Sequence, residues 1–261
     1  MPYTVRQAAI PALNRVARSY EESFVAAGYQ MAIQEIWRAY DWHWSISKLP
    51  PFGLVALQQD YGRPLYAVPT DYDKLTKAFY WDISRDQFNP VCEITTLNSL
   101  PQSVMSQWPP QALCYLSAGY SSGGTGMFRV FPRPPANIYS PFHLIDGEYK
   151  RKYSYVLNGV TKYFMEPGDA AGVYLPFEDK YFNVVVQALM WAFLSLSGSK
   201  DAGGVQMQNG IKSYFGQYAA MMSAIDQMAQ EEAMLLGTPA MAPSTGLVDD
   251  FSVYGVSYGG W

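Results

Sequence analysis

The stretch that decides how this chain is organised is EIWRAYDWHWSI at residues 35–46, followed by KLPPFG at residues 48–53. Its three tryptophans lie where a helical pattern ends and a proline-rich pattern begins. Such a cluster fits a sugar-binding platform, a nucleic-acid stacking surface or a packed hinge between two domains. Because tryptophan is more often buried than exposed, we interpret Trp37, Trp42 and Trp44 as a structural hinge. We expect Trp42 and Trp44 to point to one side of an extended chain.

The sequence before this stretch predicts two helices. Thr4 precedes a run of apolar residues at helical spacing, so it is placed to cap the first helix. Pro11 lies inside that run and predicts a kink or a late helix start. A second helix is expected over about residues 21–41, where Gly28 predicts a weak point or a break.

The sequence after the tryptophans predicts short strands. Residues 49–174 hold most of the chain's 18 prolines, and β-rich runs alternate there with turn residues. A glycine-rich hairpin tip is expected at residues 117–128, and a short helix at 97–108. The expected strands lie at residues 54–59, 63–68, 76–83, 91–95, 112–118, 126–132, 141–145 and 150–157.

Helical patterns return near residue 175. The apolar run at residues 181–198 contains Asn183 and is shorter than the ~20 residues that a membrane span needs, so we interpret it as a buried core helix. Apolar residues then recur at three- and four-residue spacing from Met207 to Ala229, which predicts one long helix that ends at Gly237.

The order of these patterns predicts an α+β fold. The predicted parts are a helical bundle built from both chain ends (residues 1–48 and 175–237), an inserted antiparallel β domain (residues 49–174) and an extended C-terminal arm (residues 238–261). The arm is rich in Gly, Pro and Ser, yet aromatic residues recur along it, and segments of this kind order when they bind a partner. We therefore expect it to bind another protein through Phe251, Tyr254, Tyr258 and Trp261.

The composition favours a protein that is covered by other protein chains. Charged residues make up 15% of the chain, against roughly 25% in an average soluble protein. Aromatic residues make up 16%, and aromatic enrichment with charge depletion is typical of interface cores. A net charge of −4 argues against a nucleic-acid-binding module, which is usually basic. The densest cationic run, residues 150–152, is interpreted as the solvated face of a strand.

The N-terminus and the cysteines predict synthesis in the cytosol. Arginine and asparagine interrupt every apolar run near the N-terminus, so no signal peptide is expected. Cys92 and Cys114 are too few for a disulfide scaffold and are interpreted as two reduced thiols.

Motifs that would indicate an enzyme are incomplete. GYSSG at residues 119–123 matches a nucleophile elbow around Ser121, but a glycine and a strand follow it instead of a helix. His143 follows Ser121 with no acidic residue between them. The phosphate-loop lysine is missing, and the histidines and cysteines show no zinc spacing. Acidic pairs such as Glu231 and Glu232 are interpreted as solvated charges. We therefore expect no enzymatic activity, no cofactor and no metal.

Several motifs, taken in their order, resemble one protein family. The segments IWRAYDWHWS, YGRPLYAVPTDYDKL, GMFRVFPRPP and LPFEDKYFNVVVQALMWAFL follow one another along the chain. In this order and spacing they resemble the head-to-tail adaptor (connector, or neck) proteins of tailed bacteriophages, over roughly residues 5–235. The matched positions are Trp37, Trp42, Trp44, Tyr66, Pro69, Asp71, Tyr72, Phe131, Pro132, Pro135, Leu175 and Pro176.

The resemblance implies a structural virion protein with no cofactor. Proteins of this family form a ring, usually twelvefold, beneath the portal protein at the neck between head and tail. The ring extends the DNA channel and carries the tail or nozzle protein, so genomic DNA passes through without specific binding. The resemblance also implies assembly in the host cytoplasm and no membrane. Two alternatives remain open: another tail subunit (nozzle, tube or baseplate), and a carbohydrate-binding or hydrolytic tail protein.

Overall fold

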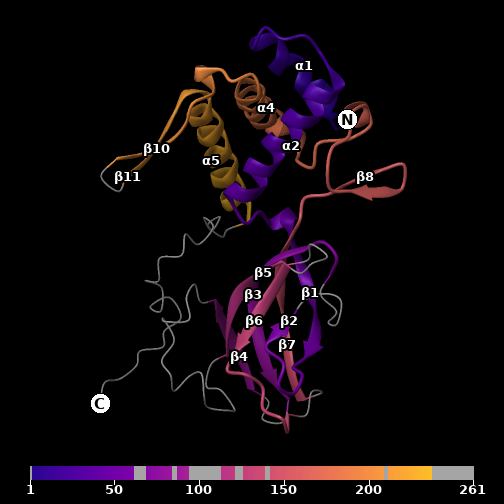
Figure 1. Ribbon diagram of the computed structural model, residues 1–261, viewed down its shortest axis with the longest axis vertical. Coiled ribbons are helices and arrows are strands. Elements are labelled where there is room, and N and C mark those ends of the chain that lie inside the picture. The colour runs from indigo at the N-terminus through magenta and orange to yellow at the C-terminus, as the bar shows by residue number, and fades with distance from the viewer. Residues whose placement is uncertain are drawn as a thin grey trace. The chain divides into compact units, whose positions relative to one another are not determined.

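The computed structural model describes residues 2–61, 69–83, 87–93, 113–120, 126–138, 142–208 and 211–236. Within these ranges the chain forms two compact units, which we call the helical unit (residues 2–42 and 153–236) and the sheet unit (residues 43–152). Helices dominate the first and a broad sheet makes up the second (Figure 1). The predicted mixed α+β class is therefore confirmed.

The boundaries of the units differ from those expected from the sequence. Residues 153–174 belong to the helical unit rather than to the β region. The reason is that Tyr153 packs there, with its hydroxyl oxygen 2.7 Å from that of Tyr29 and its ring 5.3 Å from the ring of Trp37. The expected strand at 63–68, the expected helix at 97–108 and the arm at 238–261 lie outside the described residues.

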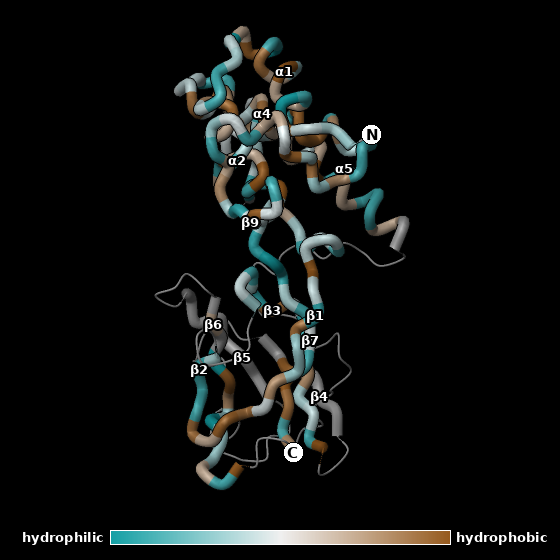
Figure 2. Tube along the Cα trace, turned by 90° about the vertical axis from the view of Figure 1, so that its right-hand side faces the viewer, coloured by the Kyte–Doolittle hydropathy of each residue, from teal (hydrophilic) through white to brown (hydrophobic). Residues whose placement is uncertain are grey.

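The helical unit contains α1 (Val5–Arg15), α2 (Glu22–Ala39), α4 (Phe182–Leu196) and α5 (Gly216–Leu236). Helix α4 packs against the other three. Its buried residues therefore lie around much of its circumference, which explains its nearly continuous apolar sequence and confirms it as a core helix. Hydrophilic and hydrophobic colours both occur along α1 and α5 (Figure 2). In the described part of the chain, no helix is long and apolar enough to cross a membrane.

Two local signals at the N-terminus have clear structural outcomes. The Oγ1 of Thr4 accepts a hydrogen bond from the backbone N–H of Gln7, and the Gln7 side chain accepts one from the backbone N–H of Thr4, which confirms the predicted cap. The prediction of a break at Gly28 is wrong. A Cβ there would lie 2.3 Å from the ring of Phe193, so this glycine lets α2 approach α4 closely.

The prediction of a single long helix from Met207 is also wrong at its start. Residues 204–215 form a hairpin of β10 (Gly204–Gln208) and β11 (Ile211–Phe215), and α5 begins only at Gly216. The strands pair antiparallel, with Val205 opposite Tyr214. A second hairpin of the same unit joins β8 (Tyr155–Leu157) and β9 (Val160–Lys162).

The sheet unit is built on one seven-stranded sheet with the order β1-β7-β3-β4-β5-β6-β2. All neighbours pair antiparallel except β4 and β5, which are parallel, so the predicted purely antiparallel domain is corrected at that pair. The strands are β1 (Ile46–Gly53), β2 (Asp60–Tyr61), β3 (Tyr72–Asp82), β4 (Gln87–Glu93), β5 (Leu113–Tyr120), β6 (Gly126–Phe131) and β7 (His143–Arg151).

The first strand was missed by the sequence patterns because it contains Pro50 and Pro51. Proline is tolerated in a sheet at an edge strand or at a bulge. Strand β1 is an edge strand, and its register with β7 shifts between Leu49 and Phe52, where the two prolines lie. The expected strand at residues 54–59 is instead the loop that connects β1 to β2.

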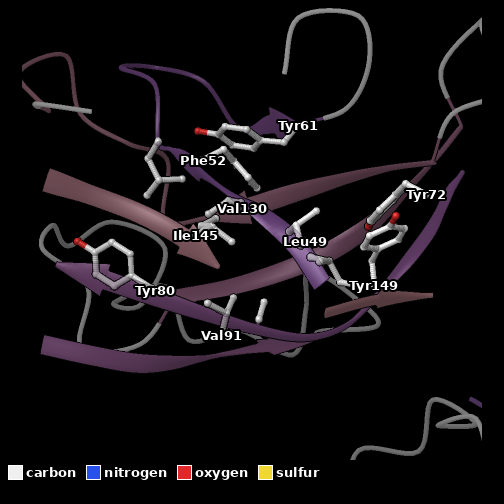
Figure 3. Packing of buried hydrophobic residues seen from close by; sticks show 12 residues of the cluster. Leu49, Phe52, Tyr61, Tyr72, Tyr80, Val91, Val130, Ile145 and Tyr149 are labelled. Carbon is white, nitrogen blue, oxygen red and sulfur yellow. The ribbon is translucent and has the colours of Figure 1, made fainter. Parts of the chain in front are cut away.

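The two edge strands meet, so the sheet curls around its own core. The ring of Phe52 in β1 lies 5.4 Å from the ring of Tyr61 in β2, and the Tyr61 hydroxyl accepts a hydrogen bond from the backbone N–H of Val55. Figure 3 shows the side chains that fill the enclosed space. This core comprises Leu49, Phe52, Leu54, Tyr61, Tyr72, Leu75, Ala78, Tyr80, Val91, Val130, Ile145 and Tyr149.

Candidate interaction surface

The most exposed large apolar side chains of the helical unit include those around the β8–β9 hairpin. Phe164 is 70% exposed, Val156 is 66% exposed and Val160 is 57% exposed. Isolated exposed apolar residues are common on protein surfaces, but several together indicate a binding surface. Val156 pairs with Thr161, and Val160 pairs with Leu157, so the two valines lie on opposite faces of this hairpin. We use the name Phe164 surface for Phe164 together with Val156.

The backbone around Phe164 is fixed although its side chain faces solvent. The side-chain amide of Gln30 donates to the carbonyl oxygen of Tyr163 at 3.4 Å and accepts from the N–H of Met165 at 3.1 Å. The hydroxyl of Tyr155 donates to the carbonyl oxygen of Phe164 itself at 2.8 Å. Three hydrogen bonds therefore hold the backbone at Phe164 in position before any partner binds, which lowers the entropy cost of ordering this segment on binding.

A buried carboxylate ties the same turn to the hairpin. The Oδ2 of Asp169 accepts hydrogen bonds from the Lys162 ammonium at 2.9 Å, from the Tyr155 hydroxyl at 2.8 Å and from the Glu166 N–H at 3.3 Å. Burial by itself would raise the pKa of Asp169, but these hydrogen bonds outweigh it and leave the pKa below its ordinary value. Burial, together with the hydrogen bond to Asp169, raises the pKa of Tyr155 to about 12.

The β10–β11 hairpin is the second place where apolar side chains are exposed. Met207 is 66% exposed, and Val205 and Phe215 are also exposed. Val205 and Met207 lie on one face of the ribbon, with Tyr214 and Lys212 opposite them in register. Phe215 lies on the other face. A two-stranded ribbon that exposes apolar side chains on both faces is a candidate interaction surface.

The base of this hairpin is fixed by two glycines in backbone contact. Gly203 and Gly216 have φ of +70° and +65°, which side chains rarely adopt. A Cβ on Gly203 would lie 1.9 Å from the carbonyl oxygen of Phe215, and one on Gly216 would lie 2.6 Å from the Cα of Gly203. Only glycine fits at both positions, so the ribbon leaves the helices at a defined place.

The two hairpins project from opposite sides of the helical unit, with β10 and β11 on one side of the helices and β8 on the other (Figure 1). The Phe164 surface and the β10–β11 ribbon are therefore two separate surfaces of one unit. Neither surface was predicted from the sequence.

The tryptophans of the predicted hinge are divided between the two units. Trp42, in the helical unit, is fully buried and its indole N–H donates to the carbonyl oxygen of Ile36 at 2.7 Å. Trp37 is buried in the same unit. Trp44 belongs to the sheet unit and lies in a 3₁₀ turn (η1, His43–Ser45), so the expected extended chain at this point is wrong. Their role as a hinge stays a prediction.

Positions that carry the family resemblance make local contacts in the sheet unit. The backbone N–H of Tyr72 donates to the carbonyl oxygen of Pro69 at 3.1 Å, which closes the turn. The carboxylate of Asp71 accepts a hydrogen bond from the hydroxyl of Tyr149 at 2.9 Å, and the rings of Tyr72 and Tyr149 stack. Burial, with the hydrogen bond to Asp71, raises the pKa of Tyr149 to about 12. Tyr66 lies outside the described residues.

The remaining matched positions are divided between the end of β6 in the sheet unit and the start of the returning segment in the helical unit. Phe131 and Pro132 are joined by a cis peptide bond at the end of β6. The backbone N–H of Leu175 donates to the carbonyl oxygen of Tyr3 at 2.8 Å, which ties the start of the returning helical segment to the N-terminus.

Two charges that the sequence indicated as solvated are buried. Lys150 is 3% exposed in β7, which pairs on both sides with other strands, and Glu232 is 5% exposed on α5. Glu231 is exposed as expected. Both errors have one cause, because a short polar pattern does not show which side of a strand or helix another element will cover.

The groups that the sequence analysis considered for catalysis and metal binding are only partly described. No cluster of three histidine, cysteine or acidic residues in those ranges could hold a metal ion. His143 lies with its Nδ1 2.7 Å from the Tyr80 hydroxyl and 4.0 Å from the carboxylate of Asp82. Ser121 and the side chains of Cys92 and Cys114 lie outside the described part, so the predictions for these residues stay predictions.

The arm residues assigned to partner binding, Phe251, Tyr254, Tyr258 and Trp261, lie outside the described residues. Comparison of the sequence with protein-family profiles and with curated proteins found no match. The function is therefore inferred from the exposed surfaces and from the family resemblance in the sequence.

One signal for the second hairpin was present in the sequence. Residues 204–208 alternate with a period of two, residues 211–215 begin and end with apolar residues, and Asn209-Gly210 lies between the two runs. Asn-Gly between two alternating runs is the strongest short-range signal for a hairpin. The helical spacing of Met207, Ile211 and Tyr214 masked it.

Proposed function

We propose that this chain is a head-to-tail adaptor of a tailed bacteriophage. In this function it forms a ring beneath the portal protein, extends the DNA channel and carries the tail or nozzle protein. The observation that carries the proposal is the rigid presentation of exposed apolar side chains, above all Phe164, on a projecting surface rather than in a cavity. Surfaces of this kind bind other proteins.

The arrangement of the chain supports the same proposal. Residues 2–42 and 153–236 make up the helical unit and the sheet unit is inserted between them, which is also the order expected for the family. The finer architecture is part of the proposal: the helical unit acts as the bundle that builds the ring, and the arm at residues 238–261 reaches the portal protein. The net charge of −4 suits a channel that DNA passes without specific binding.

The alternative of a sugar-binding tail protein loses its main support. Its platform would be the rings of Trp37, Trp42 and Trp44, and two of these three are buried. A buried indole has no face to stack on a sugar ring. Another tail subunit, such as a nozzle, tube or baseplate protein, remains the second candidate because it too would need exposed apolar surfaces.

The proposal is tested by mixing the full-length chain with the portal protein encoded in the same genome. We expect a complex with a fixed number of copies per portal ring, measured by native mass spectrometry and seen as an added ring by electron microscopy. A chain that never binds the portal, and that is found along the tail by labelling of the virion, contradicts the proposal and supports the second candidate.

A variant tests the role of the arm in the same assay. A chain that lacks residues 246–261 should keep its melting temperature but lose attachment to portal-bearing heads. If it attaches as well as the full chain does, the arm is not the portal-binding element.

A further inference from the structure

We infer that copies of this chain join head to tail, with the β10–β11 ribbon of one copy bound to the Phe164 surface of the next. This contact would join neighbouring copies in the proposed ring. That such contacts close into a ring rests on the proposed function.

The two surfaces match in apolar character. The ribbon offers Val205 and Met207 on one face and Phe215 on the other, and the Phe164 surface offers Phe164 with Val156. Burial of these side chains against each other removes apolar area from water. Both surfaces are fixed in place before contact, the ribbon by its glycine base and Phe164 by its backbone hydrogen bonds.

The charges of the two surfaces are opposite. Around Phe164 lie three carboxylates and one ammonium: Glu166 and Asp169 bind Lys162, and Glu22 accepts a hydrogen bond from the N–H of Gly168. This surface is therefore negative. Residues 204–215 contain a single charged residue, Lys212, so the ribbon is positive. Opposite potentials favour this pairing and disfavour the contact of two like surfaces.

The placement of the hairpins selects a second copy as the partner. The ribbon and the Phe164 surface project from opposite sides of one unit (Figure 1), so the ribbon does not cover the Phe164 surface of its own chain. Two different complementary patches on one molecule make a heterologous contact, which continues from copy to copy into a ring or a filament.

Two variants of the full-length chain test the inference. Met207→Asp damages the ribbon and leaves the Phe164 surface intact, whereas Phe164→Asp does the reverse. Both side chains are largely exposed, so both variants should melt at the wild-type temperature. Met234→Asp is the matched control, because Met234 is an exposed methionine of the same unit outside both surfaces.

We expect the wild type and the Met234→Asp control to form species larger than a dimer in sedimentation velocity at high concentration, and each test variant alone to stay monomeric. An equal mixture of the two test variants should form a dimer and stop there, because only one competent ribbon and one competent Phe164 surface remain per pair. A photo-cross-linker at position 207, in a mixture of isotope-labelled and unlabelled chains, should link to residues 153–169 of another copy.

Three results would overturn the inference. The first is a wild type that is monomeric at its solubility limit and gives no such cross-link. The second is a Phe164→Asp variant that assembles as the wild type does, which would indicate contact between two ribbons. The third is a mixture of variants that stays monomeric. The portal-binding assay separates the two proposals. If the two test variants form the mixed dimer but the wild type does not bind the portal protein, only the adaptor function is overturned.

Discussion

The β8–β9 and β10–β11 hairpins present exposed apolar side chains in the same way but are anchored by different physics. The first is held by side-chain hydrogen bonds that converge on Asp169 and Gln30. The second is held by the close approach of the backbones at Gly203 and Gly216. The anchor of the β8–β9 hairpin therefore depends on an ionised carboxylate, whereas the anchor of the β10–β11 hairpin depends on the absence of a Cβ. The first should therefore respond to pH and the second should not.

The largest expected effect comes from a side chain at the base of the β10–β11 hairpin. Gly203→Val places a branched Cβ against the Phe215 carbonyl oxygen at a φ of +70°. We expect it to lower the free energy of unfolding by ~3 kcal/mol or more, measured by chemical denaturation. Gly204→Ala is the control, since a Cβ there meets nothing closer than 3.9 Å, and it should change stability by less than ~1 kcal/mol. Equal stability of the two variants would show that the glycine contact does not anchor the hairpin.

A smaller effect is expected at the carboxylate that anchors the β8–β9 hairpin. Asp169→Asn keeps the shape but removes the charge that Lys162 and Tyr155 bind, so the free energy of unfolding should fall by about 1–3 kcal/mol at neutral pH. Glu178→Gln, at an exposed surface pair, is the control and should change little.

The pH dependence sharpens this prediction. Because the pKa of Asp169 is lowered in the folded chain, its stabilisation is present above the unfolded value of about 3.9 and is lost as the pH falls through the lower folded value. The difference between the wild type and Asp169→Asn should therefore shrink as the pH is lowered below about 4. Gly203→Val should show no such change, and a constant difference for Asp169→Asn would contradict the assignment.

A still smaller loss is expected when the amide that flanks Phe164 is removed. Gln30→Ala deletes both hydrogen bonds to the chain on either side of Phe164, and about 1 kcal/mol should be lost. Hydrogen exchange of the Met165 amide should speed up, since Gln30 accepts its hydrogen bond. Gln206→Ala, on the exposed ribbon, serves as the control. Unchanged exchange of the Met165 amide in Gln30→Ala would show that Gln30 does not fix the backbone next to Phe164.

The smallest effect is expected for the exposed apolar residues themselves. The double variant Val156→Ser with Val160→Ser should change the free energy of unfolding by no more than about 0.5 kcal/mol, because both side chains already face solvent. Its melting temperature should therefore stay close to that of the wild type. The same double variant should weaken self-association. A large loss of stability in the monomer would show that these residues support the fold of the unit and are not a surface held ready for a partner.

Local signals in the sequence were sufficient where one short segment carries all the physics. Thr4 and Gln7 form the predicted cap because a capping box needs only four consecutive residues. The core helix α4 could be predicted because a helix covered on several sides needs apolar residues around its circumference. Such a continuous apolar run is visible in the sequence. Asn209-Gly210 is a signal for the second hairpin that is equally local, although the residues around it also show helical spacing.

The order of residues was therefore sufficient to predict the α+β class, the capped first helix and the buried α4. Features that depend on distant partners could be read only from the folded chain: the pairing of β1 with β7 despite its prolines, the burial of Lys150, and the contact of Gly28 with Phe193. The Phe164 surface belongs to this second group, since the Gln30 side chain bonds to the backbone of Met165 across 135 residues of chain. The physical reason is that capping and amphipathic periodicity are local, whereas burial, close backbone approach and the positioning of an exposed ring depend on residues that only the fold brings together.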